Sequence, residues 1–428
     1  MNILILGSGG REHSLAWAVA QNPKCDRLMV APGNAGIAKI ADCVDLNIVD
    51  GAAVLAFVRS QAIDFVIIGP EAPLAAGVAD VLRAADVLCF GPSQAAAQLE
   101  ASKFFTKSIC DAAGAPTAGY GHFTDQQSAS DYVRKMGAPI VVKADGLAAG
   151  KGVIVAMSVE EALEALDDMF GGEFGSAGAE VVIEEFMEGE EASYFILCDG
   201  RDVLAIGTAQ DHKRVGEGDI GPNTGGMGAY SPAPVVDALV HQRAMERIIL
   251  PTLRGMAAEG APFTGFLYAG LMIDASGNPR VLEYNCRFGD PETQPILMRL
   301  RSDLVELCEA ALAGKLDNYH AVWDSRFALG VVMVAEGYPG DYARGDQISG
   351  LKQAQSDNIK VFHAGTRQDE DHIVTDGGRV LCVTALGKTV REAQDLAYQT
   401  VNTINWRGAA WRPDIGWRAV KPHDTHST

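Results

Sequence analysis

The sequence lacks the features that identify several large classes of protein. Its 428 residues contain no uninterrupted apolar run of about 20 residues, the length that a membrane helix needs. The eight cysteines are scattered and include no C-x-x-C pair, which argues against a zinc or redox site and fits a reducing cytoplasm. A net charge of -20 disfavours nucleic acid and anionic membranes as partners. We expect a soluble cytoplasmic protein that binds neither.

The composition is that of a compact protein with several domains. Hydrophobic residues make up 48% of the chain and charged residues 21%, which excludes general disorder. At roughly 150 residues per domain, the length predicts about three folding units.

The first hundred residues alternate short apolar runs with helical patterns. Residues 3–6 read as a buried strand, 7–10 as a turn and 11–21 as a helix. Further apolar runs at 28–30, 65–68 and 87–90 are separated by helical patterns at 52–60 and 74–85. This order predicts a doubly wound parallel sheet in an α/β domain.

The first turn is glycine-rich but does not complete a dinucleotide-binding fingerprint. Glu12 stands where that fingerprint requires its third glycine, so an NAD-binding domain is disfavoured. Gly9 and Gly10 at a helix N-terminus, together with Arg11, are suited to binding an anion. Asn34 and other strand-end residues such as Glu71 would meet them at the carboxyl edge of the sheet. The alternative is a tight β–α turn without a ligand.

A second glycine-rich segment follows the strand that ends at Lys143. Gly146 and Gly150 enclose only three residues and Gly152 follows the next lysine, so it is no Walker A loop. A lysine beside a glycine-rich hairpin can nevertheless close over a triphosphate. A plain β-hairpin is the alternative.

The apolar run at 181–183 leads into Glu184, Glu185, Phe186 and Met187. Its backbone could contact the edge of an adenine while Phe186 or Met187 packs on the ring and a carboxylate binds the ribose. A solvated, charged turn is the competing interpretation.

The most specific motif is the segment 281–294. Side chains of a strand alternate, so Glu283, Asn285 and Arg287 share one face. A carboxylate and an amide oxygen suit Mg2+, and the arginine can hold a carboxylate or phosphoryl oxygen with two hydrogen bonds. Asp290 follows in the same loop. The competing interpretation is a surface ladder of salt bridges.

A fifth stretch, 209–214, precedes a glycine-rich loop at 216–228. The stretch combines basic residues such as Lys213 with this loop and could position an anionic substrate. His212 fits a local hydrogen-bonding role as well as a catalytic one.

These motifs together resemble the phosphoribosylamine-glycine ligase (glycinamide ribonucleotide synthetase) family of ATP-grasp enzymes, and the resemblance covers essentially the whole chain. The segments that carry it are Leu6–His13, Gly69–Leu74, Lys143–Gly152, Gln210–Gly228 and Arg287–Glu292.

The resemblance implies an α/β multidomain fold. Residues 1–101 would form an N-terminal substrate-binding domain with the doubly wound parallel sheet. Residues 102–328 would form the two-lobed ATP-grasp region, with a lid at about 120–190 and a core at 102–119 and 191–328. Residues 329–428 would form a small C-terminal α+β domain. ATP would lie between lid and core.

The resemblance also assigns roles to residues. The ATP contacts would be Lys103, Lys143, Gly146, Gly150, Gly152, Glu184, Glu185, Phe186, Met187 and Glu191. At least one Mg2+ or Mn2+ ion would bind Glu283 and Asn285. The substrate contacts would be Gly9, Gly10, Arg11, Asn34, Glu71, Asp211, Lys213, Arg287 and Asp290, with Arg287 acting in catalysis. Many such enzymes have a further metal-binding carboxylate on the preceding strand. Asp274 lies near that position but out of phase with the strand alternation, so whether a second metal ion binds stays an open question.

The activity so implied is the ligation of glycine to 5-phosphoribosylamine through glycyl phosphate, forming ADP, phosphate and glycinamide ribonucleotide in purine biosynthesis. We expect a monomer. Two alternatives remain: another carboxylate-amine or carboxylation ligase of the same architecture, and a nucleotide-binding regulator with an NAD-like first domain.

Overall fold

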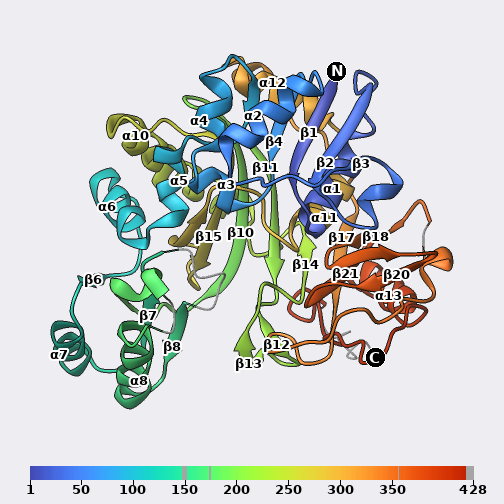
Figure 1. Ribbon diagram of the computed structural model, residues 1–428. Coiled ribbons are helices and arrows are strands. Elements are labelled where there is room, and N and C mark those ends of the chain that lie inside the picture. Colours follow the sequence, from blue (N-terminus) through green and yellow to red (C-terminus); the bar gives the residue numbers. More distant parts are fainter. Residues whose placement is uncertain (147–151, 173–174, 355, 421–428) are drawn as a thin grey trace, which may run out of the picture.

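The computed structural model describes residues 1–146, 152–172, 175–354 and 356–420 of the chain. These residues form one parallel sheet, one large antiparallel sheet, a smaller four-stranded sheet and two short hairpins, with helices packed around them (Figure 1). The predicted α/β multidomain class is confirmed.

The N-terminal domain is built on a parallel sheet with the strand order β3-β2-β1-β4-β5. Its central strand β1 pairs in parallel with β2 and with β4, and residues 3–6 are fully buried because helices cover both faces. Its elements are β1 (Asn2–Gly7), α1 (Gly10–Val19), β2 (Arg27–Pro32), β3 (Asp42–Cys43), α2 (Gly51–Ser60), β4 (Phe65–Ile68), α3 (Glu71–Ala75), α4 (Val78–Arg83), β5 (Leu88–Phe90) and α5 (Gln94–Ala101).

The prediction of a single helix at 74–85 is wrong. The structure has two short helices, α3 and α4, and the first begins already at Glu71. The chain breaks between them at Gly77, whose φ of 77° lies in the left-handed region that a continuous helix cannot contain. The break leaves Glu71 on a short helix at the carboxyl edge of the sheet.

The lid is a separate lobe at the lower left of Figure 1, formed by the antiparallel sheet β6-β9-β7-β8 and the helices α7 and α8. Its hydrophobic cluster draws only on residues between Ala129 and Ile183, so the lobe packs on its own core. Its elements and the preceding helix are α6 (Lys103–Ala113), β6 (Tyr120–Phe123), α7 (Gln126–Met136), β7 (Ile140–Ala144), β8 (Val153–Ala156), α8 (Val159–Phe170) and β9 (Val181–Glu185).

The core lobe and the C-terminal region share one sheet with the order β16-β15-β10-β11-β14-β17-β21-β18. The C-terminal strands therefore extend the core sheet through the pairing of β14 with β17. The core elements are β10 (Glu190–Asp199), β11 (Val203–Asp211), β12 (Arg214–Gly216), β13 (Ile220–Asn223), β14 (Gly228–Ser231), α9 (Ala238–Ala244), α10 (Leu250–Ala258), β15 (Thr264–Ile273), β16 (Pro279–Asn285), α11 (Thr293–Arg299) and α12 (Leu304–Leu312). The C-terminal elements are β17 (Phe327–Val334), β18 (Ile359–His363), β19 (Thr366–Asp369), β20 (His372–Thr375), β21 (Arg379–Gly387) and α13 (Val390–Val401).

The sequence predicted that the glycine-rich segment 216–228 is one open loop, and this prediction is wrong. The segment contains β13, which pairs with β12 in a short hairpin. Among the described residues no helix has the length and hydropathy to cross a membrane. All eight cysteines are described, and each is a free thiol.

Candidate active site

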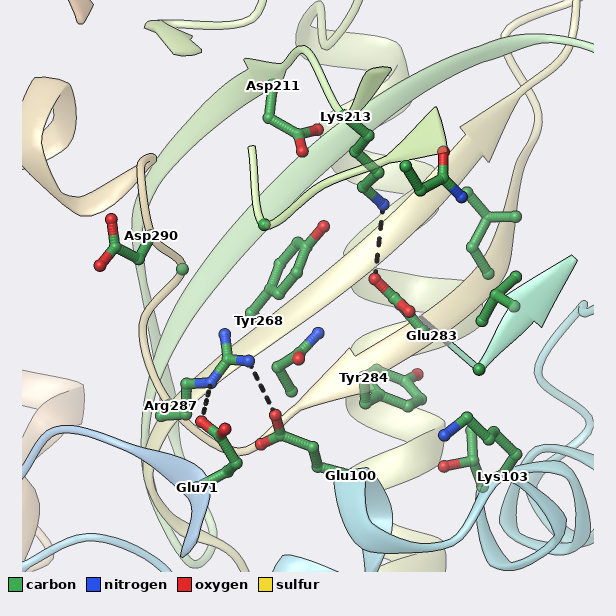
Figure 2. A pocket seen from close by; sticks show the side chains of 18 of the residues that line it. Glu71, Glu100, Lys103, Asp211, Lys213, Tyr268, Glu283, Tyr284, Arg287 and Asp290 are labelled. Carbon is green, nitrogen blue, oxygen red and sulfur yellow. Dashed lines mark hydrogen bonds and ion pairs between the residues drawn. The ribbon is translucent and has the colours of Figure 1, made fainter. Parts of the chain in front are cut away.

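Two adjoining cavities open between the lid, the core lobe and the N-terminal domain. The first has a volume of about 400 Å³ and the second about 370 Å³. They share a wall that includes Glu184, Asp211, Lys213 and Glu283, so they form two ends of one site. Figure 2 shows part of the first cavity, with β15 and β16 behind the side chains.

The second cavity is lined by the segment predicted to contact adenine. Phe186 is 37% exposed while Met187 is buried, and Met272 and Leu282 of the core sheet line the same cavity. The backbone N–H of Glu185 donates to the carbonyl of Gly119. This end offers apolar surfaces on two sides, which suits a flat ring.

A buried carboxylate lies between two lysines at the junction of lid and core. Glu184 Oε1 is 2.9 Å from Lys143 Nζ and 3.2 Å from Lys107 Nζ, and all three side chains are nearly inaccessible. Lys143 also donates to the carbonyl of Leu282 at 3.1 Å, which directs it toward the core. The Glu184 side chain thus orients the predicted phosphate-binding lysine. Lys107 was not predicted.

The N-terminus of α6 meets the glycine-rich hairpin. Asp145 accepts hydrogen bonds from the backbone N–H groups of Lys103 and Phe104, and Lys103 Nζ donates to the carbonyl of Gly146 at 2.6 Å. Lys103, Gly146 and Gly152 line the first cavity. Gly150 lies outside the described residues.

The predicted metal ligands lie next to each other on β16. Glu283 and Asn285 both line the first cavity. Burial by itself raises the pKa of Glu283, but Lys213, Lys143 and Lys103 outweigh it and hold the pKa below its ordinary value. A carboxylate kept ionised beside an amide oxygen fits a hard divalent cation. Asp274, by contrast, accepts from the N–H groups of Ser276 and Asn278 in the turn after β15.

Arg287 lies just beyond the end of β16, between two carboxylates (Figure 2). Its Nη2 is 2.9 Å from Glu100 Oε1 and its Nε is 3.3 Å from Glu71 Oε2. Burial opposes the charge of the guanidinium, yet the two carboxylates raise its pKa. Burial raises the pKa of Glu100, whereas Arg287 and Arg11 bring that of Glu71 below its usual range. Glu100 was missed because it lies in a plain helical pattern.

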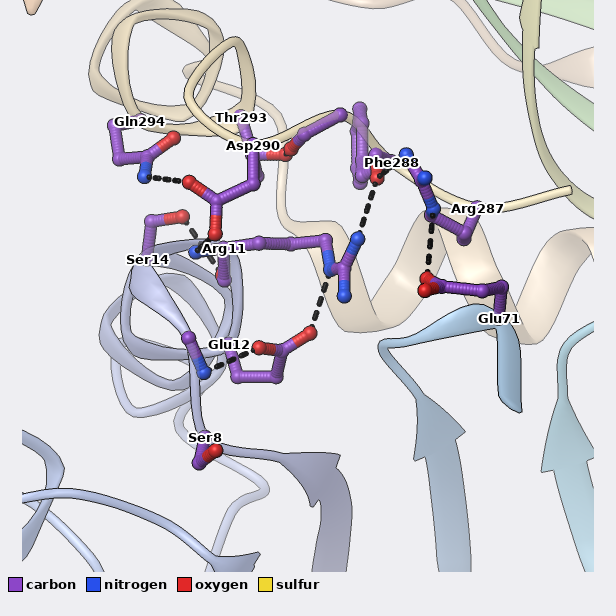
Figure 3. A network of polar contacts seen from close by, with 12 residues as sticks. Ser8, Arg11, Glu12, Ser14, Glu71, Arg287, Phe288, Asp290, Thr293 and Gln294 are labelled. Atoms are coloured by element: carbon purple, nitrogen blue, oxygen red, sulfur yellow. Dashed lines mark hydrogen bonds and ion pairs between the residues drawn. The ribbon is translucent and has the colours of Figure 1, made fainter. Parts of the chain in front are cut away.

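The first turn is closed by side chains from its own helix and from the loop after β16 (Figure 3). Glu12 Oε2 accepts from the N–H of Gly9 at 2.6 Å, and Asp290 Oδ2 accepts from the N–H of Arg11 at 3.2 Å. A Cβ at Gly9 would lie 2.9 Å from Glu12 Oε2, and one at Gly10 would lie 2.5 Å from Gln294 Nε2. Glu12 therefore fills the space that a dinucleotide fingerprint leaves free.

The predicted substrate residues divide into two groups. Arg11, Glu71, Asp211, Lys213, Arg287 and Asp290 line the first cavity. Gly9 and Gly10 are outside its lining, as is Asn34, whose Nδ2 donates to the carbonyls of Ser8 and His363 and whose Oδ1 accepts from two backbone N–H groups. The side chain of Asn34 thus ties the first turn to the C-terminal region.

Asp211 and Lys213 are carried by a segment that the C-terminal region holds in place. His212 between them is fully buried, and its Nε2 accepts from the N–H of Gly416 at 3.2 Å. Burial lowers its pKa to about 3, helped by nearby arginines. His212 therefore has the local hydrogen-bonding role. Lys213 contacts Glu191 and lies 3.5 Å from Glu283.

The C-terminal region also supplies arginines that the sequence did not reveal. Arg379, at the start of β21, donates to the carbonyl of Asp290 at 2.5 Å and lines the first cavity, and Arg418 lines the second. Arg379 and Arg11 together lower the pKa of Asp290 against the effect of burial. No local pattern marks either arginine. Arg379 reaches the site on β21 of the shared sheet, and Arg418 reaches it from the turns that follow α13.

Comparison with known proteins matches the chain to one family along nearly its whole length. This family is described as phosphoribosylglycinamide synthetase. Its N domain matches residues 1–100, its ATP-grasp (A) domain matches residues 101–293, and its C domain matches residues 328–418. The phosphoribosylamine–glycine ligase of Vibrio cholerae is 61% identical over 98% of this chain and 99% of its own. That of Yersinia pestis is 60% identical with the same coverage.

Solved structures agree. The phosphoribosylamine–glycine ligase of Thermotoga maritima superposes with a TM-score of 0.85 at 31% identity, covering 97% of this chain and 100% of its own. The biotin carboxylase domain of the Hydrogenobacter thermophilus 2-oxoglutarate carboxylase, solved with MgADP and bicarbonate, has a TM-score of 0.75 at 16% identity. It covers 96% of this chain and 91% of its own, a likeness of fold alone.

Proposed function

The chain belongs to the phosphoribosylglycinamide synthetase family, and we propose that it ligates glycine to 5-phosphoribosylamine with hydrolysis of ATP to ADP and phosphate. The product is glycinamide ribonucleotide, an intermediate of purine biosynthesis. The observation that carries the proposal is the pair of adjoining cavities, one with apolar walls and lysines, the other with Arg287 between carboxylates.

ATP is proposed to bind with its adenine in the second cavity and its phosphates toward the first. Glu185, Phe186 and Met187 surround the ring, and Glu191 holds the ribose. Lys103, Lys143, Gly146 and Gly152 surround the phosphates. The same role for Gly150, which lies outside the described residues, stays a prediction. The positive charges near the shared wall offset the triphosphate in a protein that is otherwise strongly acidic.

Glu283 and Asn285 are proposed to hold Mg2+ or Mn2+. A divalent ion bound there would neutralise negative charge on the phosphate oxygens. The oxygen donors and the ionised carboxylate fit either metal.

The reaction begins with attack of a glycine carboxylate oxygen on the γ-phosphorus of ATP. The bond from the γ-phosphorus to the bridging oxygen breaks, and ADP leaves with that electron pair. Lys103 and Lys143 stabilise the negative charge on the transferred phosphoryl group, and Arg287 orients the glycine carboxylate. The products of this step are ADP and glycyl phosphate.

In the second step the amine of 5-phosphoribosylamine attacks the carbonyl carbon of glycyl phosphate. A C–N bond forms, the C–O bond to phosphate breaks, and the amine loses a proton. Arg11, Glu71 and Asp290 lie at the end of the first cavity nearest the N-terminal domain and are proposed to contact the phosphoribosyl group. Gly9, Gly10 and Asn34 are proposed to shape the turn that supports them.

We also propose that the protein acts as a monomer in the cytoplasm and uses small molecules as its only substrates. Eight free thiols suit a reducing compartment. Light scattering on the purified protein measures its mass, and a dimer would contradict the monomer.

A coupled assay of ADP release with single omissions tests the function. We expect full turnover only when ATP, glycine and 5-phosphoribosylamine are all present. A carboxylation ligase of the same fold would instead require bicarbonate and would ignore the omission of glycine. That outcome would replace the proposed reaction.

The metal assignment has its own test. Glu283→Ala removes the only carboxylate proposed to bind the metal, and we expect a loss of at least about 10³-fold in ADP formation. Binding of Mn2+ measured by electron paramagnetic resonance with ADP present should be lost as well. Normal Mn2+ binding in this variant would contradict the assignment.

A further inference from the structure

A buried acidic pair lies in the wall of the first cavity, apart from the carboxylates that contact Arg287. Glu292 is only 4% exposed and Asp211 is partly buried, and both line this cavity. They come from different parts of the chain, the N-cap of α11 and the end of β11. Tyr268 of β15 lines the same cavity, and Figure 2 shows its ring and hydroxyl near Asp211.

Neither carboxylate has a cation of its own. No ion pair of the described residues includes Asp211 or Glu292. Lys213, which lines the same cavity, pairs with Glu191 and Glu283. Burial raises the pKa of both carboxyl groups, and Glu292, Glu191 and Glu283 add to this effect at Asp211. Lys213 opposes it at both groups without cancelling it. Two carboxylates that line a cavity without an ion-pair partner of their own favour a cationic ligand.

Glu292 is held in a defined orientation. Ser193, fully buried on β10, donates to Glu292 Oε1 at 3.3 Å and also lies 3.3 Å from the Tyr268 hydroxyl. A Cβ at position 289 would lie 2.3 Å from Glu292 Oε2, so only glycine at that position leaves the carboxylate room. Ser193 is thus a positioning residue for Glu292.

We propose that Glu292, together with Asp211, binds the ammonium group of the amino acid substrate, and so selects an α-ammonium carboxylate over a plain carboxylate. This inference rests on the proposed function, in which the amino acid is glycine. Arg287 and Glu292 lie on the same short segment after β16, so one loop provides a cation for the carboxylate end and an anion for the ammonium end. The charge pattern matches that of a zwitterion.

The test is Glu292→Gln, which keeps the size and removes the charge. Loss of a charge-assisted hydrogen bond predicts that KM for glycine rises about 10- to 100-fold. KM for ATP should not change. Glycolate, which carries a hydroxyl in place of the ammonium group, should be a poor substrate of the unaltered protein, and the preference for glycine over glycolate should collapse in the variant.

Four further experiments separate recognition of the ammonium group from a loss of structure. The shift in melting temperature on adding ATP should stay unchanged in Glu292→Gln if the variant is folded. Asp211→Asn should also raise KM for glycine, and Ser193→Ala should do so to a smaller extent without affecting KM for ATP. Glu259→Gln, the same substitution at the exposed end of α10, is the matched control and should behave like the unaltered protein.

The pH dependence gives an independent reading. KM for glycine should rise as the pH falls and the pair takes up protons, and this rise should be smaller in Glu292→Gln. If both Glu292→Gln and Asp211→Asn leave KM for glycine and the glycolate preference unchanged while turnover with glycine persists, the inference is overturned and the proposed function stands. Absence of glycine-dependent turnover in the unaltered protein would instead overturn the proposed function.

Discussion

At the lid end of the site one carboxylate lies between two lysines, and at the opposite end one arginine lies between two carboxylates. Glu184 pairs with Lys107 and Lys143, whereas Arg287 pairs with Glu71 and Glu100. If all members are ionised, the first group has an excess of one positive charge and the second an excess of one negative charge. Both are largely buried.

The difference matches what each end is proposed to bind. The positive group lies beside the cavity assigned to ATP, and the negative group lies where the amino group of a substrate would enter. A buried charge group with an unbalanced sum costs folding free energy until a ligand of opposite sign binds. Removing one charged side chain should therefore change stability and activity by different amounts at the two ends.

The largest effect is expected for Arg287→Met. The change leaves Glu71 and Glu100 without their shared cation and removes the group that orients the glycine carboxylate. We expect kcat/KM for glycine to fall about 10³-fold and the free energy of unfolding to fall by about 3 kcal/mol, measured by urea denaturation.

Adding Glu100→Gln to Arg287→Met sharpens this prediction. The second substitution removes one of the stranded carboxylates, so stability should recover in part while activity stays low. Equal stability of the single and double variants would show that the two carboxylates do not depend on Arg287.

A smaller effect is expected for Lys143→Met at the lid end. Lys107 stays 3.2 Å from Glu184, so the remaining pair is balanced and the cost in stability should be about 1 kcal/mol. Steady-state kinetics should show a fall of about 10²-fold in kcat/KM for ATP. A loss of stability as large as that of Arg287→Met would break the comparison between the two ends.

Glu184→Gln should have a weaker effect on activity. The substitution removes the ionic attraction between Glu184 and Lys143 but keeps the lysine itself, so the lysine is displaced but not removed, and kcat/KM for ATP should fall about 10-fold. Because two buried lysines then lack a carboxylate, ATP should protect this variant against heat more than it protects the unaltered protein. Equal protection, measured by differential scanning fluorimetry, would contradict the role of Glu184 as their counter-ion.

The smallest effect on activity is expected at the segment that joins the two ends, where the predicted change is in the pH dependence of stability. The pKa of His212 is about 3 in the folded protein and about 6.5 in an unfolded chain, so the unfolded state binds more protons between these values. The free energy of unfolding should therefore decrease as the pH falls below about 6.5, with a contribution approaching 1.4 kcal/mol per pH unit from this residue. His212→Gln should reduce that slope between pH 7 and pH 5, and an unchanged slope would be inconsistent with a neutral buried imidazole.

Local patterns in the sequence predicted the parts of the site that lie within one element. Glu283 and Asn285 follow from strand alternation, and the contact segment 184–187 follows from an apolar strand that ends in polar residues. The same patterns failed at the helix 74–85, where a single glycine in a left-handed conformation divided it. They also left the hairpin β12–β13 unrecognised, because its residues are mostly glycine and polar.

The sequence by itself determined the family, the order of strands and helices and the chemical types of the main ligands, because these depend on residues close together in the chain. Only the tertiary structure decided the charge groups. Lys107 contacts Glu184, which lies 77 residues further along the chain. Arg379 contacts Asp290 from the shared sheet, and Ser193 contacts Glu292 inside the core. Side-chain contacts between such distant residues depend on sheet pairing, which no local periodicity encodes.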